Sequence, residues 1–238
     1  MTNTQQNQFT PPTSLFSKQQ EKLYQYQFSG TIFVPVLVGG TPSNDRVAEG
    51  WLKSKIADND DLIRELVATT MAERNISADE AIEYVDILKH LNGFKRHEED
   101  GLYIEGRQLK SAIKEAANIL WAKDRWGPTN KGTRSFFAEH VFVREDRLHM
   151  RHAATGETVI EADGIQQRFV STFRGTGIQY EQICRDVEID FTIITDYEFK
   201  NSQWADLWSC GEMQGIGASR SQGYGKYVVS GWDRSQAA

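Results

Sequence analysis

Four glycines crowd into eleven residues near the end of the chain, and they restrict what this stretch can form. Residues 215–225 read GIGASRSQGYG, two Gly-X-Gly triplets with an apolar or aromatic X, separated by five residues. Glycine accepts positive φ and lets the backbone approach a ligand closely. Successive backbone N–H groups in such a loop can cradle phosphate oxygens. The motif therefore predicts a binding loop, and the simpler alternative is a glycine hairpin with no ligand.

The side chains inside this loop suit an anionic, aromatic ligand. Ser219, Ser221 and Gln222 supply hydrogen-bond donors around Arg220, whose planar fork matches phosphate or a base edge. Tyr224 either stacks on a base or is the first core residue of the last strand. The residues expected to contact nucleic acid in this segment are Gly215, Gly217, Ser219, Arg220, Ser221, Gln222, Gly223, Tyr224, Gly225 and Lys226.

Apolar periodicity predicts an alternation of strands and helices around this loop. Strands are expected over 24–38, 183–195 and 224–230, with an extended hairpin over 139–163 that turns at Thr155-Gly156. Helices are expected over 107–121, on the spacing of Leu109 to Leu120, and over 202–210, which presents Trp204 and Trp208. The order strand, helix, strand pair, strand, helix, strand predicts an α+β, ferredoxin-like (RRM-like, split βαβ) core.

A basic stretch lies in the middle of an otherwise acidic chain. The net charge is −6, yet residues 107–134 hold seven Lys or Arg against two acids. A local basic surface on an acidic protein is compatible with phosphate binding, although a solvated helix face is the plainer interpretation. A helix N-terminus favours an anion. The cations expected at the site are Arg107, Lys110, Lys114, Lys131 and Arg134.

The remaining segments predict one domain with an insertion. Residues 1–23 are polar and are expected to form a disordered arm, with a single domain over 24–238. A helical insertion is expected over 46–100, with a capping box at Ser77 and Glu80 and a helix stop at Gly93. No apolar run is long enough to span a bilayer, so no membrane partner and a cytoplasmic location are expected. Cys184 and Cys210 have no metal-ligand spacing, which predicts reduced thiols and neither metal nor cofactor.

Two stretches resemble a known family. GIGASRSQGYG is similar to the glycine-rich loop of the RAMP superfamily, the backbone and processing proteins of CRISPR effector complexes. Residues 102–114, LYIEGRQLKSAIK, resemble the segment Y-I-P-G-S-S-L-K-G that opens the family's first helix. Here Glu105 replaces the proline, Arg107-Gln108 replace two small residues, and Ser111 replaces the glycine. The first strand, ending in Gly39-Gly40, also fits.

The resemblance implies an RNA-binding protein. In the family the glycine loop and the start of the first helix contact guide RNA, which implies that Gly215 to Gly225, Arg107 and Lys110 hold an RNA backbone. The hairpin 139–163 resembles the thumb of the backbone subunits, which stack head to tail into helical filaments. Single-stranded RNA, guide or target, and further copies of the chain are therefore the expected partners.

Two other functions remain open from the sequence. The resemblance implies the first, a metal-independent RAMP-like endoribonuclease, with Asp45 in the loop after the first strand as the candidate catalytic residue. The same Asn-Asp pair is also ordinary turn or cap chemistry. The five histidines are scattered and form no recognisable catalytic set. A ferredoxin-like interaction protein without nucleic acid is the other, with Trp204 and Trp208 as packing or partner anchors.

Overall fold

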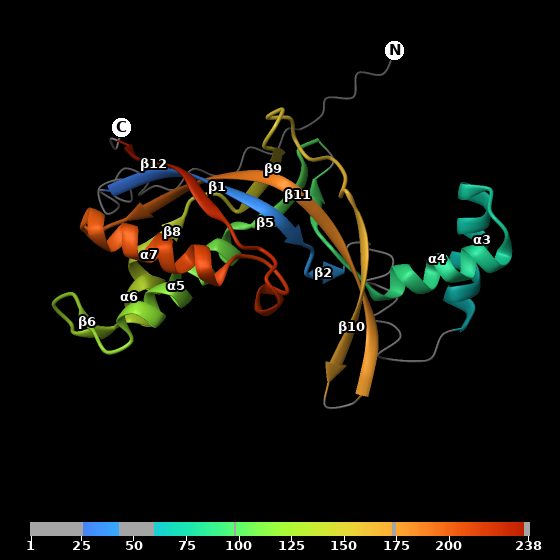
Figure 1. Ribbon diagram of the computed structural model, residues 1–238, viewed down its shortest axis with the longest axis horizontal. Helices are drawn as coiled ribbons and strands as arrows, with labels where there is room; N and C mark the ends of the chain where they lie inside the picture. The colour runs from blue at the N-terminus through green and yellow to red at the C-terminus, as the bar shows by residue number, and fades with distance from the viewer. Residues whose placement is uncertain (1–25, 43–59, 98, 173–174, 236–238) are drawn as a thin grey trace, which may run out of the picture.

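The computed structural model describes residues 26–42, 60–97, 99–172 and 175–235 of the 238-residue chain. Helices and strands are mixed along the chain, and the strands form a large, mainly antiparallel sheet (Figure 1). The chain therefore has the α+β class expected from the sequence. The expected arm over 1–23 and the loop that carries Asp45 lie outside the described residues.

Two long strands form the centre of the sheet. β1 (Tyr26–Val38) pairs antiparallel with β11 (Gly175–Thr195) over most of its length. β12 (Val228–Ser235) lies on the other side of β1, and β9 (Arg147–His152) on the other side of β11. Beyond β9 follow β5 (Gly101–Glu105) and β4 (Lys95–His97), which gives the order β12-β1-β11-β9-β5-β4. Every neighbouring pair in this order is antiparallel.

Three helices lie on one face of this sheet: α5 (Gly106–Trp121), α6 (Thr133–His140) and α7 (Asn201–Gln214) (Figure 1). The predicted stripe on α5 is buried at every position except Leu120, which remains 39% exposed in the last turn. Trp204 of α7 packs at 5.1 Å from the ring of Phe28, and Trp208 at 5.4 Å from Phe191. Both tryptophans are buried, so they anchor the core and do not face an outside partner.

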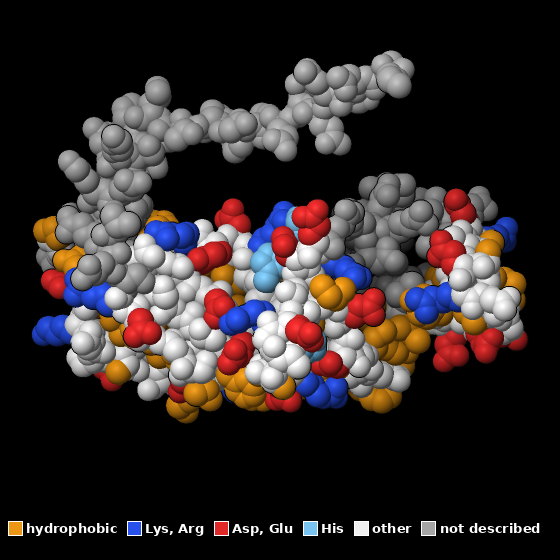
Figure 2. Space-filling view, turned by 90° about the horizontal axis from the view of Figure 1, so that it is seen from above, with side chains coloured by type: hydrophobic (Ala, Val, Ile, Leu, Met, Phe, Trp, Pro, Cys, Tyr) orange, Lys and Arg blue, Asp and Glu red, His pale blue; other side chains and the backbone are white. Residues whose placement is uncertain are grey.

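The opposite face of the sheet is polar, because strand side chains alternate between the two faces. Thr31 donates a 2.7 Å hydrogen bond to Asp190, and the Asp190 carboxylate also lies 2.5 Å from the Arg151 guanidinium. Glu188, also on β11, lies 3.9 Å from the same guanidinium. Seen from above, Lys or Arg and Asp or Glu side chains are interspersed over the surface (Figure 2). Carboxylates on β11 make the centre of this face a poor place for phosphate.

The prediction of a hairpin over 139–163 is right only for its second half. The turn at Thr155-Gly156 brings the Val159 N–H to 2.9 Å from the carbonyl of Met150. The first half is wrong: α6 runs to His140, and β8 (Val141–Val143) pairs with β11 rather than with β9. Val141, Leu148 and Met150 are buried in the core, and a free-standing hairpin would have exposed them.

The hairpin that does extend from the body consists of β10 (Gly164–Thr172) and the first half of β11 (Figure 1). Its two faces differ. Ile165, Phe169 and Ile178 are exposed on one face, Phe169 by 72%. Arg168 and Glu181 lie on the other face and are directed at the glycine loop. The sequence missed this hairpin because the predicted strand began only at residue 183.

The described part of the expected insertion is helical, with α3 (Asp60–Arg74) and α4 (Ala78–His90). The capping box is present: the Ser77 N–H donates to the Glu80 carboxylate at 2.9 Å, and the Glu80 N–H to the Ser77 hydroxyl at 3.3 Å. The predicted helix stop at Gly93 is wrong. α4 ends at His90, and β3 (Leu91–Gly93) joins the sheet beside β11 and β2 (Thr41–Pro42).

The segment between α5 and α6 is also ordered. β6 (Arg125–Trp126) and β7 (Lys131–Gly132) pair antiparallel, and the Trp126 indole donates to the Thr133 hydroxyl at 2.9 Å. That hydroxyl donates in turn to the Trp121 carbonyl at 2.5 Å, so the end of α5 and the start of α6 are tied together. Among the described residues, no helix is both long and apolar enough to cross a membrane.

Candidate nucleic-acid interface

The glycine loop leaves α7, makes one turn of 3-10 helix, η1 (Arg220–Gln222), and enters β12. All four glycines of the motif have positive φ: 79° at Gly215, 80° at Gly217, 93° at Gly223 and 69° at Gly225. A Cβ on Gly225 would lie 1.8 Å from the Ile216 carbonyl oxygen, whereas one on Gly223 would meet open space. The glycines are therefore required by the backbone, which accounts for much of the motif before any ligand is considered.

The base of the loop is fixed to the sheet. The Ile216 N–H donates to the Gly225 carbonyl at 2.8 Å, and the Gly225 N–H donates to the Val36 carbonyl of β1 at 2.9 Å. Ile216 is fully buried between them. The tip, Ser221 to Gly223, is exposed. The loop is thus a rigid base carrying an exposed turn.

A buried ionic network holds the loop against the β10–β11 hairpin. The Glu181 carboxylate lies 2.7 Å from the Arg168 guanidinium and accepts a 2.8 Å hydrogen bond from the Ser219 hydroxyl. Its side chain is 1% exposed, and that of Arg168 17%. Arg168 also donates to Gln222, and the Tyr224 hydroxyl donates to Gln166 at 3.1 Å. Three residues predicted to contact the ligand, Ser219, Gln222 and Tyr224, are therefore engaged within the chain.

Arg220 makes a different kind of pair. Its guanidinium lies 2.8 Å from the Glu115 carboxylate of α5, and the two side chains are 33% and 41% exposed. An ion pair this exposed contributes at most about 1 kcal/mol, so a phosphate can compete for the arginine. Lys226 donates to the Met213 carbonyl at the end of α7, beside the loop.

The structure brings the loop close to the start of α5, the two segments on which the family resemblance rests. Gly217 and Ala218 of the loop line one small pocket with Gln108 of α5. The Gln108 side-chain oxygen is buried and has no hydrogen-bond partner among the described residues. No side chain caps the N-terminus of α5, and its first turn holds no acidic residue. The other residues of the pocket are Val38, Gly40, Gly93, Phe94, Lys95, Tyr103, Ile104 and Glu105.

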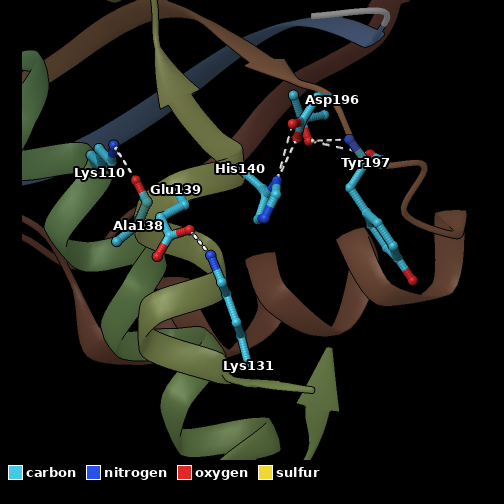
Figure 3. A network of polar contacts seen from close by, with 8 residues as sticks. Lys110, Lys131, Ala138, Glu139, His140, Asp196 and Tyr197 are labelled. Atoms are coloured by element: carbon cyan, nitrogen blue, oxygen red, sulfur yellow. Dashed lines mark hydrogen bonds and ion pairs between the residues drawn. The ribbon is translucent and has the colours of Figure 1, made fainter. Parts of the chain in front are cut away.

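Three of the predicted cations are engaged elsewhere. Arg107 donates to Glu105 at 2.9 Å, and this bond, together with Lys95, lowers the pKa of the Glu105 carboxyl. Lys110 donates to the Ala138 carbonyl of α6 at 2.8 Å and lies 3.8 Å from the ring centroid of Phe142. Burial and the charge of Lys114 lower the pKa of Lys110. Lys131 pairs with Glu139, so two of the three cations are directed at α6 (Figure 3).

Lys114 and Arg134 have no ionic or hydrogen-bond partner within the described parts of the chain, and Arg134 is exposed. Lys114 follows Lys110 by one turn on α5 and lies near it. The exposed face of α5 therefore runs from these two lysines past Arg107 and Ser111 to Gln108 and Glu115, which meet the loop. The predicted cations therefore lie on one side of the loop, across α5 from it, and do not surround the loop.

Sequence reasoning missed the residues that position the loop. Glu181 and Arg168 lie in a strand and a hairpin whose extent was not predicted. Glu115 and Gln108 are seven residues apart and so share a face of α5. That spacing was a usable signal, because both are polar residues beside the predicted cations.

The structure gives little support to other chemistry among the described residues. His140 lies 2.8 Å from Asp196, and this contact ties α6 to the end of β11 (Figure 3). The described residues contain no metal-binding group of His, Cys, Asp and Glu. Burial raises the pKa of the Cys184 thiol to about 12, so it stays protonated. The endoribonuclease role of Asp45 stays a prediction, because that residue lies outside the described part.

Comparison with known proteins adds a likeness of overall shape. No protein-family model matches the chain, and no curated protein matches its sequence. Among solved structures, a chain in the cryo-EM structure of the Type III-B Cmr-beta complex bound to cognate target RNA is similar, with 10% identity and a TM-score of 0.46. The match covers 94% of this chain and 65% of that one. A likeness of this degree assigns neither a family nor a function.

Proposed function

We propose that the chain is a RAMP-like, single-stranded RNA-binding protein whose glycine loop and first helix hold the RNA backbone. One observation carries the proposal: Gly217, Ala218 and Gln108, from the two segments that the sequence singled out, line the same pocket. The unpartnered Gln108 oxygen accepts a hydrogen bond, which suits a ribose hydroxyl or a base amino group. The uncapped start of α5 suits a phosphate.

The charges favour this side of the molecule over the centre of the sheet's open face. Lys114 and Arg220 attract phosphate oxygens. Arg220 binds the ligand by giving up its exposed ion pair with Glu115. Arg168 is not available, because its partner Glu181 is almost fully buried and would be left without a counter-charge. The centre of that face, around Glu188 and Asp190 on β11, repels RNA. The expected path therefore crosses α5 beside the loop.

The strand order supports the ferredoxin-like part of this proposal. In a split βαβ core the fourth strand lies beside the first, and the third lies between the first and the second. β12, β1, β11 and β9 have this order, with α5 and α7 on one face. The added strands β4 and β5 extend it at one edge.

We propose head-to-tail self-association along RNA as the second part of this function. What supports it is the β10–β11 hairpin, whose outer face exposes Phe169, Ile165 and Ile178. Exposed apolar side chains on a projecting hairpin gain free energy when a partner covers them. Sedimentation with single-stranded RNA should show large particles for the native chain and single-copy complexes for Phe169→Ser. Equal particle sizes would contradict this part alone.

Two substitutions with opposite expected effects on affinity test RNA binding. Arg220→Gln removes a phosphate contact, so it should weaken binding to single-stranded RNA and reduce the slope of log affinity against log salt by roughly one. Glu115→Gln removes a repelling charge and frees Arg220, so it should strengthen binding. Fluorescence anisotropy of labelled RNA across a salt series measures both. Arg234→Gln, at the far end of β12 from the loop, is the matched control. Unchanged affinity in both test variants would refute the proposed interface.

A further inference from the structure

A row of polar and aromatic side chains crosses the three strands β4, β5 and β9. The register aligns Lys95 with Tyr103 and Tyr103 with His149. The neighbouring residues on β5 and β9, such as Leu102 and Leu148, are buried in the core. Because side chains alternate along a strand, the row lies on the face turned away from the core.

The ring of Tyr103 is only loosely covered. The Arg147 guanidinium lies 5.5 Å from its centroid, and the imidazole of His149 lies 5.6 Å away, tilted by 49°. Elsewhere in the chain Arg74 closes over Tyr84 at 4.0 Å and donates to its hydroxyl at 2.6 Å. Tyr103 has no hydrogen-bond partner for its hydroxyl among the described residues. Its aromatic face and its polar end are therefore both available to a ligand.

The contact made by His149 fixes which of its nitrogens is free. Nδ1 lies 2.9 Å from the Asp100 carbonyl oxygen. A carbonyl oxygen only accepts hydrogen bonds, so the neutral ring carries its proton on Nδ1. Nε2 then carries the lone pair, on a ring whose centroid lies 5.6 Å from that of Tyr103. The site thus combines a stacking surface with a hydrogen-bond acceptor.

Charge around the row favours an anion. Glu105 is the carboxylate nearest to Arg147 in the register, but its oxygens are occupied by Lys95 at 3.0 Å and by Arg107 at 2.9 Å. Arg147 is exposed and has no carboxylate partner in the described chain. Three cations therefore face a single carboxylate here. Other acids on this face have basic partners: Asp100 lies 2.9 Å from His97, and Asp190 and Glu188 lie 2.5 Å and 3.9 Å from Arg151.

The row is continuous with the proposed RNA interface, because Lys95, Tyr103 and Glu105 also line the pocket that holds Gly217 and Ala218. We propose that this face binds one unstacked nucleotide of single-stranded RNA, with its base on Tyr103, its phosphate at Arg147, and its 2′-hydroxyl donating to His149 Nε2. The proposal rests on the RNA-binding function and adds a place where a base is held. Bases of any sequence stack on an aromatic ring, so the site is expected to be sequence-tolerant.

Ultraviolet cross-linking to oligouridine and anisotropy of the same labelled oligomer test the site. The cross-linked peptide should contain Tyr103. Tyr103→Ala should weaken binding about tenfold, the order expected for loss of one stacked base. Tyr103→Phe should keep the affinity, because the ring remains. Arg147→Gln, an exposed change that does not threaten folding, should also weaken binding. Tyr84→Ala is the matched control, a tyrosine already closed by an arginine.

The outcomes separate this site from the loop. Full affinity in Tyr103→Ala and Arg147→Gln, with weaker binding in Arg220→Gln, would overturn the nucleotide site and leave the proposed function standing. Weaker binding in the first two variants with full affinity in Arg220→Gln would support this site and exclude the glycine loop from RNA binding. Native protein that binds no oligouridine would overturn both.

Discussion

At the scale of single residues, burial decides what each charge around the glycine loop does. Arg220 and Arg168 are both paired with a glutamate, at 2.8 Å and 2.7 Å. Glu115 is 41% exposed and Glu181 only 1%. Water screens the first pair, which makes it weak and exchangeable. The second pair is shielded, and removing one partner leaves an uncompensated charge. The first arginine is free to bind, and the second holds the loop in place.

This difference predicts unequal losses of stability. Glu181→Gln should lower the free energy of unfolding by about 3 kcal/mol, because Arg168 keeps its charge without a partner. Glu115→Gln should lower it by less than about 1 kcal/mol. Urea unfolding followed by tryptophan fluorescence measures both values. Similar losses in the two variants would show that the Glu181 network is not the buried clamp described above.

The glycines of the motif predict a second contrast. Gly225→Ala forces a Cβ to within 1.8 Å of the Ile216 carbonyl oxygen, so the base of the loop must move. Gly223→Ala meets no atom and suffers only the strain of positive φ, about 1 kcal/mol. Thermal unfolding should show a much larger loss for Gly225→Ala. Equal losses would mean that conformational strain alone, and not the close approach, requires these glycines.

At the scale of elements, the sequence correctly predicted features that depend on residues close together in the chain. The α5 stripe and the Ser77–Glu80 capping box were predicted and are present. The long hairpin and the pairing of β8 were missed, because both depend on β11, a 21-residue strand that serves several partners along its length. Pairing between distant strands leaves no local pattern in either one.

The capping box predicts a pH dependence for α4. Hydrogen bonds from the Ser77 backbone and side chain lower the pKa of Glu80 from its ordinary value of 4.5. The contribution of Glu80 to stability is therefore fully present above pH 4.5 and is lost as the pH falls through the lower, folded-state value. The stability difference between native protein and Glu80→Ala should shrink over that range. Glu83→Ala, on the same helix, is the control, and a matching change there would point to general charge effects.

At the scale of the whole molecule, the candidate interface joins segments that are more than a hundred residues apart. Gln108 and Glu115 of α5 meet Gly217 and Arg220 because α5 and α7 pack on the same face of the sheet. The sequence indicated both segments through the glycine motif and the helix start. It did not indicate that most of the loop's donors would be engaged internally, since Arg168, Glu181 and Gln166 come from a hairpin whose position depends on the whole sheet.

The central claim, that the chain binds single-stranded RNA, is tested most directly on the purified protein. The measurement is the ratio of absorbance at 260 and 280 nm across a size-exclusion column, before and after ribonuclease, with added single-stranded RNA as the second step. The account predicts large particles rich in nucleic acid that collapse with ribonuclease but not with deoxyribonuclease. A single-copy protein free of nucleic acid that also fails to retain added RNA would contradict it.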